Sequence, residues 1–223
     1  IKYILKNIDL IVVFRNRKIS QSFVPESISQ AILNNKKLPK NIVTATDGEL
    51  YGHRYWDWWR KYLKTIKLVK TQTISEYLSN LKNIQEISCR PSSWESTPKE
   101  LAKHIPYAVW YHPKNKIHKH IWKLANFALK LNYKNENDPN HFASRLHLEN
   151  GLASCTFWWA SGRDFKHLFA PIAWHASKIE IGSQELLSAI RSLENVSKKD
   201  KLKAEKLFTK IRHLTWTKHW KKK

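Results

Sequence analysis

The sequence contains no methionine, only two cysteines and no long apolar run among its 223 residues. Cys89 and Cys155 provide neither a disulfide framework nor a CxxC metal knuckle, so we predict a reducing, cytoplasmic environment and no metal site or cofactor. Cys155 lies among apolar residues in a helical pattern, which predicts a core position. A membrane span needs a run of about eighteen apolar residues, and because none is present we expect no membrane partner.

The first residues, IKYILK, lack an initiator methionine and also lack the charged, apolar and small-residue regions of a signal peptide. Methionine is absent from the rest of the sequence as well. We therefore expect the chain to begin inside a longer protein.

Positive charge is in large excess, with 40 Lys and Arg against 18 Asp and Glu and a formal net charge of +22. Clustered basic residues would favour nucleic acid or an anionic membrane as partner. Here the charge is spread along the whole chain, and only the tail TKHWKKK (217–223) forms a basic cluster. This dispersal indicates a composition rich in Lys, Asn and Ile, so nucleic acid is not the expected partner.

The first part of the chain has the pattern of a β-α-β unit. Residues 8–14 are short, apolar and β-branched, which is typical of a strand buried on both faces of a parallel sheet. A helix is expected at 27–33, a second strand at 41–46 and an aromatic-rich helix at 55–67. Catalytic groups gather at the carboxyl ends of such strands, where residues 47–49 fall.

The second part alternates helical patterns with polar turns. TPKE (97–100) reads as an N-cap, a proline at the first helical position and an acidic residue at the third. Further helices are predicted at 117–129, 146–160, 173–193 and 198–220 from their apolar periodicity. The fold class is therefore α/β, followed by a helical bundle.

One stretch, TATDGELYGHRYWDWW (44–59), concentrates groups that could perform chemistry. Asp47 and Glu49 are two carboxylates beside aromatic rings, and glycoside hydrolysis uses carboxylates in an aromatic-walled cleft. His53 could hydrogen-bond a sugar hydroxyl or ligate a metal, and metal binding is the weaker option because no second ligand has suitable spacing. On residue types alone, a catalytic loop and a simple turn before a helix are equally supported.

Eleven tryptophans are a large number for a chain of 223 residues, and several lie at predicted loop or helix ends. Trp56, Trp94 and Trp158 are examples, and exposed rings at such places suit a platform for sugar rings or bases. A buried core position is the alternative for each of them taken alone. Trp58 and Trp59 are expected to begin the buried side of the following helix.

These motifs resemble glycoside hydrolase family 57. DGELYGH (47–53) resembles the fourth sequence region of that family, and SWE (93–95) and CTFWWAS (155–161) are similar to a loop and a helical-domain region of amylase-like members. The order and spacing agree over nearly the whole chain. The first motif is fairly specific, and the other two are informative mainly together.

The resemblance implies an incomplete (β/α)7 barrel, with its last β/α units at 1–97 and an α-helical bundle at 98–223. It implies retaining chemistry on α-glucans or oligosaccharides, with Asp47 as general acid and then base. By position, Glu49, His53, Trp56, Trp94 and Trp158 would support the reaction or contact the sugar.

The family's nucleophilic glutamate stands on an earlier strand and has no counterpart here. Glu26 follows Pro25 in a connection, and Glu95 matches a substrate-loop position, so neither replaces it. We expect the nucleophile upstream of residue 1 and no activity from the fragment alone. A noncatalytic carbohydrate-binding protein is the alternative function, and a basic nucleic-acid-binding protein is a weaker one. The motifs are shared by hydrolysis, transglycosylation and branching, and they set no chain length, linkage or oligomeric state.

Overall fold

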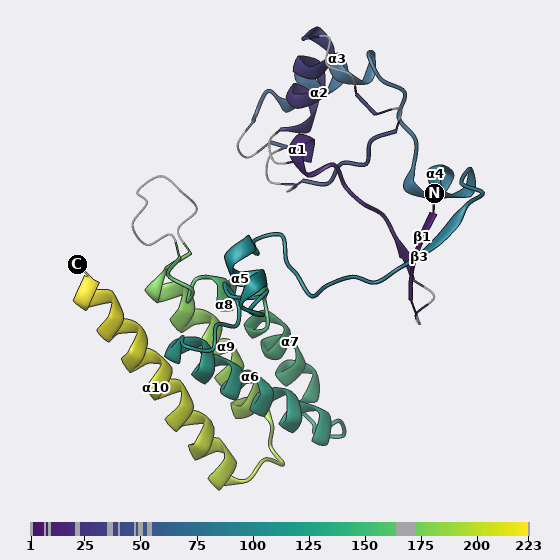
Figure 1. The fold of residues 1–223 in the computed structure, drawn as a ribbon. Coiled ribbons are helices and arrows are strands. Elements are labelled where there is room, and N and C mark those ends of the chain that lie inside the picture. Colours follow the sequence, from purple (N-terminus) through teal and green to yellow (C-terminus); the bar gives the residue numbers. More distant parts are fainter. Residues whose placement is uncertain are drawn as a thin grey trace. The chain divides into compact units, whose positions relative to one another are not determined.

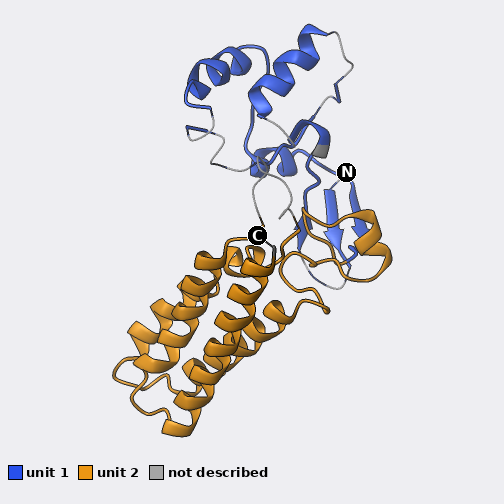
Figure 2. Cartoon of the chain, turned by 90° about the vertical axis from the view of Figure 1, so that its left-hand side faces the viewer, with its two compact units in different colours: residues 1–90 blue, residues 91–223 orange. Residues whose placement is uncertain are grey.

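The computed structural model describes residues 2–6, 8, 10–20, 23–34, 38–39, 41–46, 48, 51–52, 55–163 and 173–222, without the side chains of Arg17 and Lys222. The chain mixes α and β structure, is mostly helical and has one small sheet. It divides into two compact units, residues 1–90 and 91–223 (Figure 2). The division falls after Arg90, whereas the sequence placed it after Thr97.

The first unit combines a three-stranded sheet with short helices. In chain order its elements are β1 (Lys2–Leu5), β2 (Ile11–Val12), α1 (Arg17–Ser20), α2 (Val24–Leu33), α3 (Trp58–Ile66), α4 (Ile74–Ser79) and β3 (Ile84–Ile87). β1 is the central strand, antiparallel to β2 and parallel to β3. Tyr3 on β1 lies opposite Val12 on β2 and Gln85 on β3.

The predicted strand at 8–14, buried on both faces of a parallel sheet, is wrong in its length, burial and direction. Of the described residues in this segment, Ile11–Val12 form the strand, at the edge of the sheet and antiparallel to β1. Leu10 and Phe14 are exposed, and the Phe14 ring meets Tyr3 edge to face at 5.0 Å. A parallel strand needs covering helices on both faces, and here α2 packs on α3 instead.

The predicted strand at 41–46 is absent from the described residues, because this segment satisfies its backbone groups in another way. The Asn16 backbone N–H donates to the Val43 carbonyl (2.7 Å), and the Ala45 N–H donates to the Ser20 hydroxyl (3.2 Å). Both partners lie at helix α1, so the segment is tethered to a helix end and needs no neighbouring strand.

The two helices predicted for this part of the chain are confirmed as α2 and α3. The Thr65 hydroxyl on α3 lies 2.9 Å from the Pro25 carbonyl and 2.9 Å from the Ser29 hydroxyl, both on α2. These short polar contacts fix the two helices side by side.

The second unit is helical. Its elements are α5 (Pro98–Ala102), α6 (Lys116–Lys134), α7 (His141–Gly151), α8 (Ser154–Trp158), α9 (Ala176–Ser192) and α10 (Lys198–Lys222). Figure 1 shows the long helices running side by side, and α9 contacts α6, α7, α8 and α10. Nineteen buried apolar residues form one core between them, including Leu124, Leu148, Leu186 and Ile211. No helix in the described ranges combines the length and hydropathy needed to cross a bilayer.

The predicted helix start at 97–100 is confirmed in detail. The Thr97 side chain accepts from the Glu100 backbone N–H, and the Glu100 carboxylate accepts from the Thr97 backbone N–H at 2.9 Å. Pro98 occupies the first turn, where a missing N–H costs nothing. The local capping residues are therefore enough to locate the N-terminus of α5.

The single helix predicted at 146–160 is two helices, α7 and α8, broken at Leu152 and Ala153. Because of this break, α8 packs against α9, and Thr156 contacts Gly182 there. A β-carbon added to Gly182 would lie 2.6 Å from the Thr156 methyl group, so only glycine allows this approach.

We predict that Gly182→Ala destabilises the second unit by about 1–3 kcal/mol, through overpacking against Thr156. Helix propensity alone predicts the opposite sign, a gain of about 1 kcal/mol for Ala in a helix interior. Thermal unfolding followed by circular dichroism separates the two. A raised or unchanged melting temperature would contradict the close approach, and adding Thr156→Ala should recover part of the loss.

Candidate functional site

Asp47, Glu49 and His53, the residues that the sequence placed at the centre of the site, lie outside the described residues. Their roles remain predictions. The structure describes the chain on both sides of them, and this shows how the loop is held.

The segment before Asp47 is anchored by three contacts to α1 and the two residues that precede it. Two of them, from Asn16 to Val43 and from Ala45 to Ser20, replace a sheet ladder. The third is the Arg15 guanidinium, which donates to the Ala45 carbonyl at 2.8 Å. Both backbone groups of Ala45, two positions before Asp47, are therefore held by side chains.

The segment after Asp47 folds back on itself. The Tyr51 N–H donates to the Gly48 carbonyl at 3.0 Å, and the Gly52 N–H donates to the Tyr55 carbonyl at 3.3 Å. Gly52 has a φ of 104°, a backbone conformation that residues with a β-carbon rarely adopt. Among the described residues, Gly48 is therefore bonded to Tyr51 and Gly52 to Tyr55.

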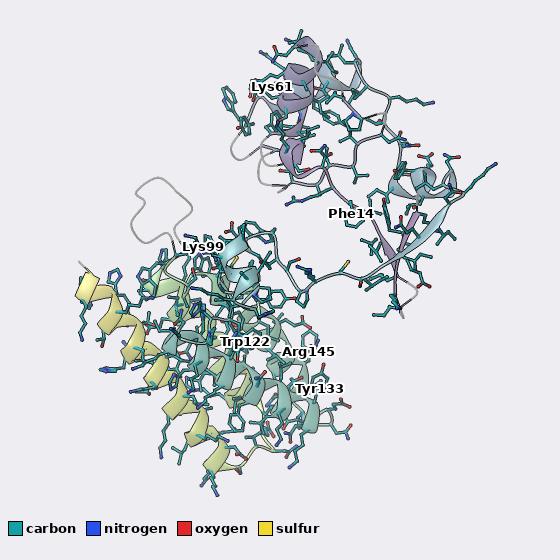
Figure 3. The ribbon with its side chains drawn as sticks, viewed as in Figure 1. Phe14, Lys61, Lys99, Trp122, Tyr133 and Arg145 are labelled. Atoms are coloured by element: carbon teal, nitrogen blue, oxygen red, sulfur yellow. The ribbon has the colours of Figure 1, made fainter. Side chains whose placement is uncertain are left out.

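An aromatic cluster supports this loop. The Phe23 ring is buried, with Tyr55 stacked on it at 4.6 Å and Tyr51 edge-on at 5.3 Å. Trp58 extends the cluster, 5.9 Å from Tyr51, and the Lys61 ammonium lies 5.4 Å from the Tyr55 ring centre. Figure 3 labels Lys61 on α3. Burial raises the pKa of Tyr51, and the neighbouring Tyr62 raises it further.

The tryptophans after the loop differ in exposure. Trp56 is 84% exposed, so its ring is available to a ligand as the sequence suggested. Trp58 is half-buried in the aromatic cluster, whereas Trp59 is 48% exposed with the Arg60 guanidinium 5.0 Å from its ring centre. The expectation that both Trp58 and Trp59 begin the buried side is therefore wrong for Trp59. Adjacent helical residues point about 100° apart, and only one of them can face α2.

Glu26 and Glu95 are both engaged in ion pairs. Glu26, in the first turn of α2, lies 3.8 Å from the Lys61 ammonium. Glu95 accepts from the Arg163 guanidinium at 3.0 Å, and the same guanidinium also bonds Glu100. Desolvation opposes ionisation of Glu100, but hydrogen bonds from Thr97 and Arg163 outweigh it and lower its pKa. Glu95 and Glu100 thus anchor the loop before α5.

Trp94 is 59% exposed at the start of a connected run of rings in the second unit. Its ring meets Trp110 edge to face at 6.0 Å, and the Trp122 indole N–H donates to the Trp110 carbonyl at 2.9 Å. Trp122 stacks on Phe157 at 4.4 Å and is labelled within this unit in Figure 3. The exposed Trp94 is thus supported from behind by rings that reach the core.

Trp158 ends the short helix α8 and is half-buried. Its neighbour Phe157 is held by His118, whose Nε2–H donates to the Phe157 carbonyl at 3.0 Å. His118 Nδ1 accepts from the His112 backbone N–H at 3.1 Å, which fixes the neutral tautomer. Cys155, predicted to be a core residue, is exposed because α8 turns Thr156 and Phe157 inward instead.

His118 is fully buried, which the sequence did not reveal. Its pKa is lowered from 6.5 to about 4, mainly by burial and to a smaller extent by the nearby Lys218 and His112, while the hydrogen bond to Phe157 opposes this shift. Neither the burial of His118 nor the ion pairs of Arg163 can be read from the sequence. Phe157, the bonding partner of His118, and Glu95 and Glu100, the partners of Arg163, lie far from them along the chain. Among the described residues, no three His, Cys, Asp or Glu side chains form a group that could hold a metal ion.

Comparisons of this chain with models of known protein families, with characterised proteins and with solved structures found no match.

We predict that the stability of the second unit falls as the pH drops from about 6.5 to about 4. In this window the unfolded chain protonates His118 while the folded state keeps it neutral, so the unfolded state binds more protons. The difference amounts to about 3 kcal/mol. Urea unfolding followed by circular dichroism at several pH values measures it, and His118→Gln should flatten the slope. An unchanged slope in the variant would show that other groups cause it.

Proposed function

We propose that this chain is part of a retaining glycoside hydrolase or transglycosylase of the family 57 type that acts on α-glucans. The observation that supports it most is the loop DGELYGH, which is tethered on both flanks and followed by an exposed tryptophan. In this proposal Asp47 protonates the leaving glycosidic oxygen, and its carboxylate then activates the water or acceptor sugar.

The tethering suits this chemistry, because an acid/base group must be held close to its productive position. Ala45 is fixed at both its N–H and its carbonyl, and Gly48 is bonded to Tyr51. Aromatic rings exclude water, which raises the pKa of a nearby carboxylic acid and favours the protonated form needed for the first step.

Exposed tryptophans would supply the sugar contacts. Trp56 and Trp94 present large ring faces to solvent, and aromatic faces stack on the apolar faces of sugar rings. Trp158 is half-buried and would contribute an edge of its ring. Glu49 and His53 would hydrogen-bond sugar hydroxyls or support Asp47.

The finer architecture belongs to the same proposal. β1 and β3 are parallel and are connected through helices, which is the connection that (β/α) barrels repeat. We propose residues 1–97 as the last units of an incomplete (β/α)7 barrel and residues 98–223 as its helical bundle. The resemblance assigns the nucleophilic glutamate to no position in 1–223, so we expect this polypeptide alone to release no sugar.

We predict that Asp47→Asn, in the protein expressed from its complete gene, lowers the rate on soluble starch at least about 100-fold, as expected for loss of a general acid/base. Reducing-end release and chain transfer are both measured, because the two outcomes use the same acid/base. Asp57→Asn is the matched control, since Asp57 is the N-cap residue of α3, outside the loop at 47–53.

A loss of less than tenfold for Asp47→Asn would remove Asp47 from its proposed role. Saturable binding of maltooligosaccharides by the same protein, with no turnover before or after the substitution, would instead show a noncatalytic carbohydrate-binding protein.

We predict that Trp94→Ala weakens maltoheptaose binding about fivefold to tenfold, since one aromatic contact contributes about 1 kcal/mol. Trp220→Ala is the control, because Trp220 is also exposed but lies near the end of α10. Isothermal titration of the two variants measures the difference. Equal losses would show that Trp94 is not a specific sugar contact.

A further inference from the structure

Three large aromatic side chains are exposed within a short part of the second unit. Trp94, Tyr107 and Tyr111 have exposed fractions of 59%, 45% and 57%. Trp94 is already part of the proposed function, whereas the two tyrosines have no role in it. Exposed aromatic residues that gather in one place mark a binding surface, while single scattered ones need no explanation. The contacts around these three show that they belong together.

Two serines tie the loop that carries Trp94 to the residue before Tyr107. The Ser96 hydroxyl donates to the Pro106 carbonyl at 2.6 Å, and the Ser93 hydroxyl donates to the same oxygen at 3.2 Å. Ser96 Oγ also accepts from the Ser93 backbone N–H at 2.7 Å, so the loop is fixed on both sides of Trp94. The backbone at Trp94 is therefore held against the backbone that leads into Tyr107.

A single turn of the chain carries both tyrosines. The Tyr107 carbonyl accepts from the backbone N–H groups of Trp110 at 2.9 Å and Tyr111 at 2.7 Å. Residues four apart on such a turn are neighbours on its surface. Ala108 and Val109, which lie between the tyrosines, are buried, so the turn is anchored by its middle residues.

Trp110 and Trp122 connect the exposed rings to one another. Trp94 meets Trp110 edge to face at 6.0 Å, and Tyr111 meets Trp122 edge to face at 6.2 Å. Trp122, labelled in Figure 3, donates its indole N–H to the Trp110 carbonyl and stacks on Phe157 of the core. Rings that are fixed before binding lose little conformational entropy when a ligand covers them, which favours affinity.

The two segments that carry these rings differ from the rest of this basic chain. Neither lysine nor arginine occurs in PSSWESTP (91–98) or HIPYAVWY (104–111), although the chain has 40 such residues. Glu95 is bonded to Arg163 at 3.0 Å. A nucleic acid is bound through basic side chains that contact its phosphates, in addition to rings that stack on its bases. The segments therefore fit an uncharged oligosaccharide better than a nucleic acid.

We propose that Trp94, Tyr107 and Tyr111 form one surface that binds an α-glucan chain, with each ring stacked on a different sugar unit. The choice of an α-glucan rests on the proposed function, whereas the surface lies entirely within the second unit and does not involve Asp47. Each tyrosine also has a hydroxyl that donates to or accepts from a sugar hydroxyl. Three rings bind a long chain better than a short one, so this surface sets a preference for chain length.

Isothermal titration of the 1–223 chain with maltose, maltotriose and maltoheptaose measures this preference. We expect this chain alone to release no sugar, so binding is followed without turnover. Maltoheptaose should bind at least about tenfold more tightly than maltose, because its length covers all three rings and maltose covers at most two. Equal affinity for maltose and maltoheptaose, or no saturable binding of either, would overturn the proposal.

The decisive variants are Tyr107→Ala and Tyr111→Ala, with Tyr133→Ala as their matched control. Tyr133 is 59% exposed in the same unit but lies near the end of α6, as Figure 3 shows. Each of the first two variants should weaken maltoheptaose binding about threefold to tenfold, and the control less than about twofold. Equal losses in all three would mean nonspecific stacking and would overturn the surface.

Conservative variants separate stacking on sugar from a purely structural role. Tyr107→Phe and Tyr111→Phe keep the ring faces, so both should retain the affinity for maltoheptaose within about threefold. Losses as large as those of the alanine variants would show that the ring faces do not bind the sugar, which would contradict the proposal. In the described part of the chain Tyr107 makes no ring contact, so Tyr107→Ala tests binding without disturbing aromatic packing.

The surface and the role of Asp47 fail in different experiments. If the tyrosine variants lose maltoheptaose while Asp47→Asn keeps its rate on starch, the surface stands and the catalytic role is wrong. If Asp47→Asn loses its rate while the tyrosine variants bind maltoheptaose as before, the surface is wrong. A single-stranded oligonucleotide whose binding falls in the same tyrosine variants, with maltoheptaose unaffected, would show a platform for bases and would also overturn the proposal.

Discussion

The second unit depends on the burial of one helix, α9, on several sides at once. Leu186, Leu187 and Ile190 are fully buried on it, and burying a leucine side chain contributes about 1.5–3 kcal/mol. α6, α7, α8 and α10 supply the covering surfaces. The Ser144 hydroxyl is paired inside this core, since it donates to the Ala189 carbonyl at 2.7 Å and accepts from the Asn132 side-chain amide at 2.9 Å. Phe157 belongs to the same core, and His118 is bonded to its carbonyl.

The described residues of the first unit form no comparable core, and aromatic contacts and hydrogen bonds hold them together. Phe23 is the largest fully buried side chain there, and Tyr51, Tyr55 and Lys61 surround it. Hydrogen bonds with Arg15, Asn16 and Ser20 hold the chain before Asp47 in place of a sheet.

The sequence predicted the parts of this fold that local chemistry decides. The capping box of Thr97 and Glu100 located a helix end, and apolar periodicity located α6, α9 and α10. The prediction from sequence was wrong where a strand pairs with a segment that is distant along the chain. Residues 8–14 have the composition of a buried strand, but which strand pairs with them and what covers them depend on distant segments. The same limit hid Arg163, whose partners Glu95 and Glu100 lie 68 and 63 residues away.

The excess of positive charge has to be considered together with the acidic side chains that already form ion pairs. Glu95 and Glu100 bond Arg163, Glu180 bonds Arg212, and Glu205 bonds Arg191 through two hydrogen bonds. These pairs join segments of the second unit. Arginine suits such forked pairs, while lysine keeps a compact charge at the end of a flexible stem. The arginines of these pairs are therefore structural, since they tie α9 to α10 and residues 95–100 to Arg163 after α8.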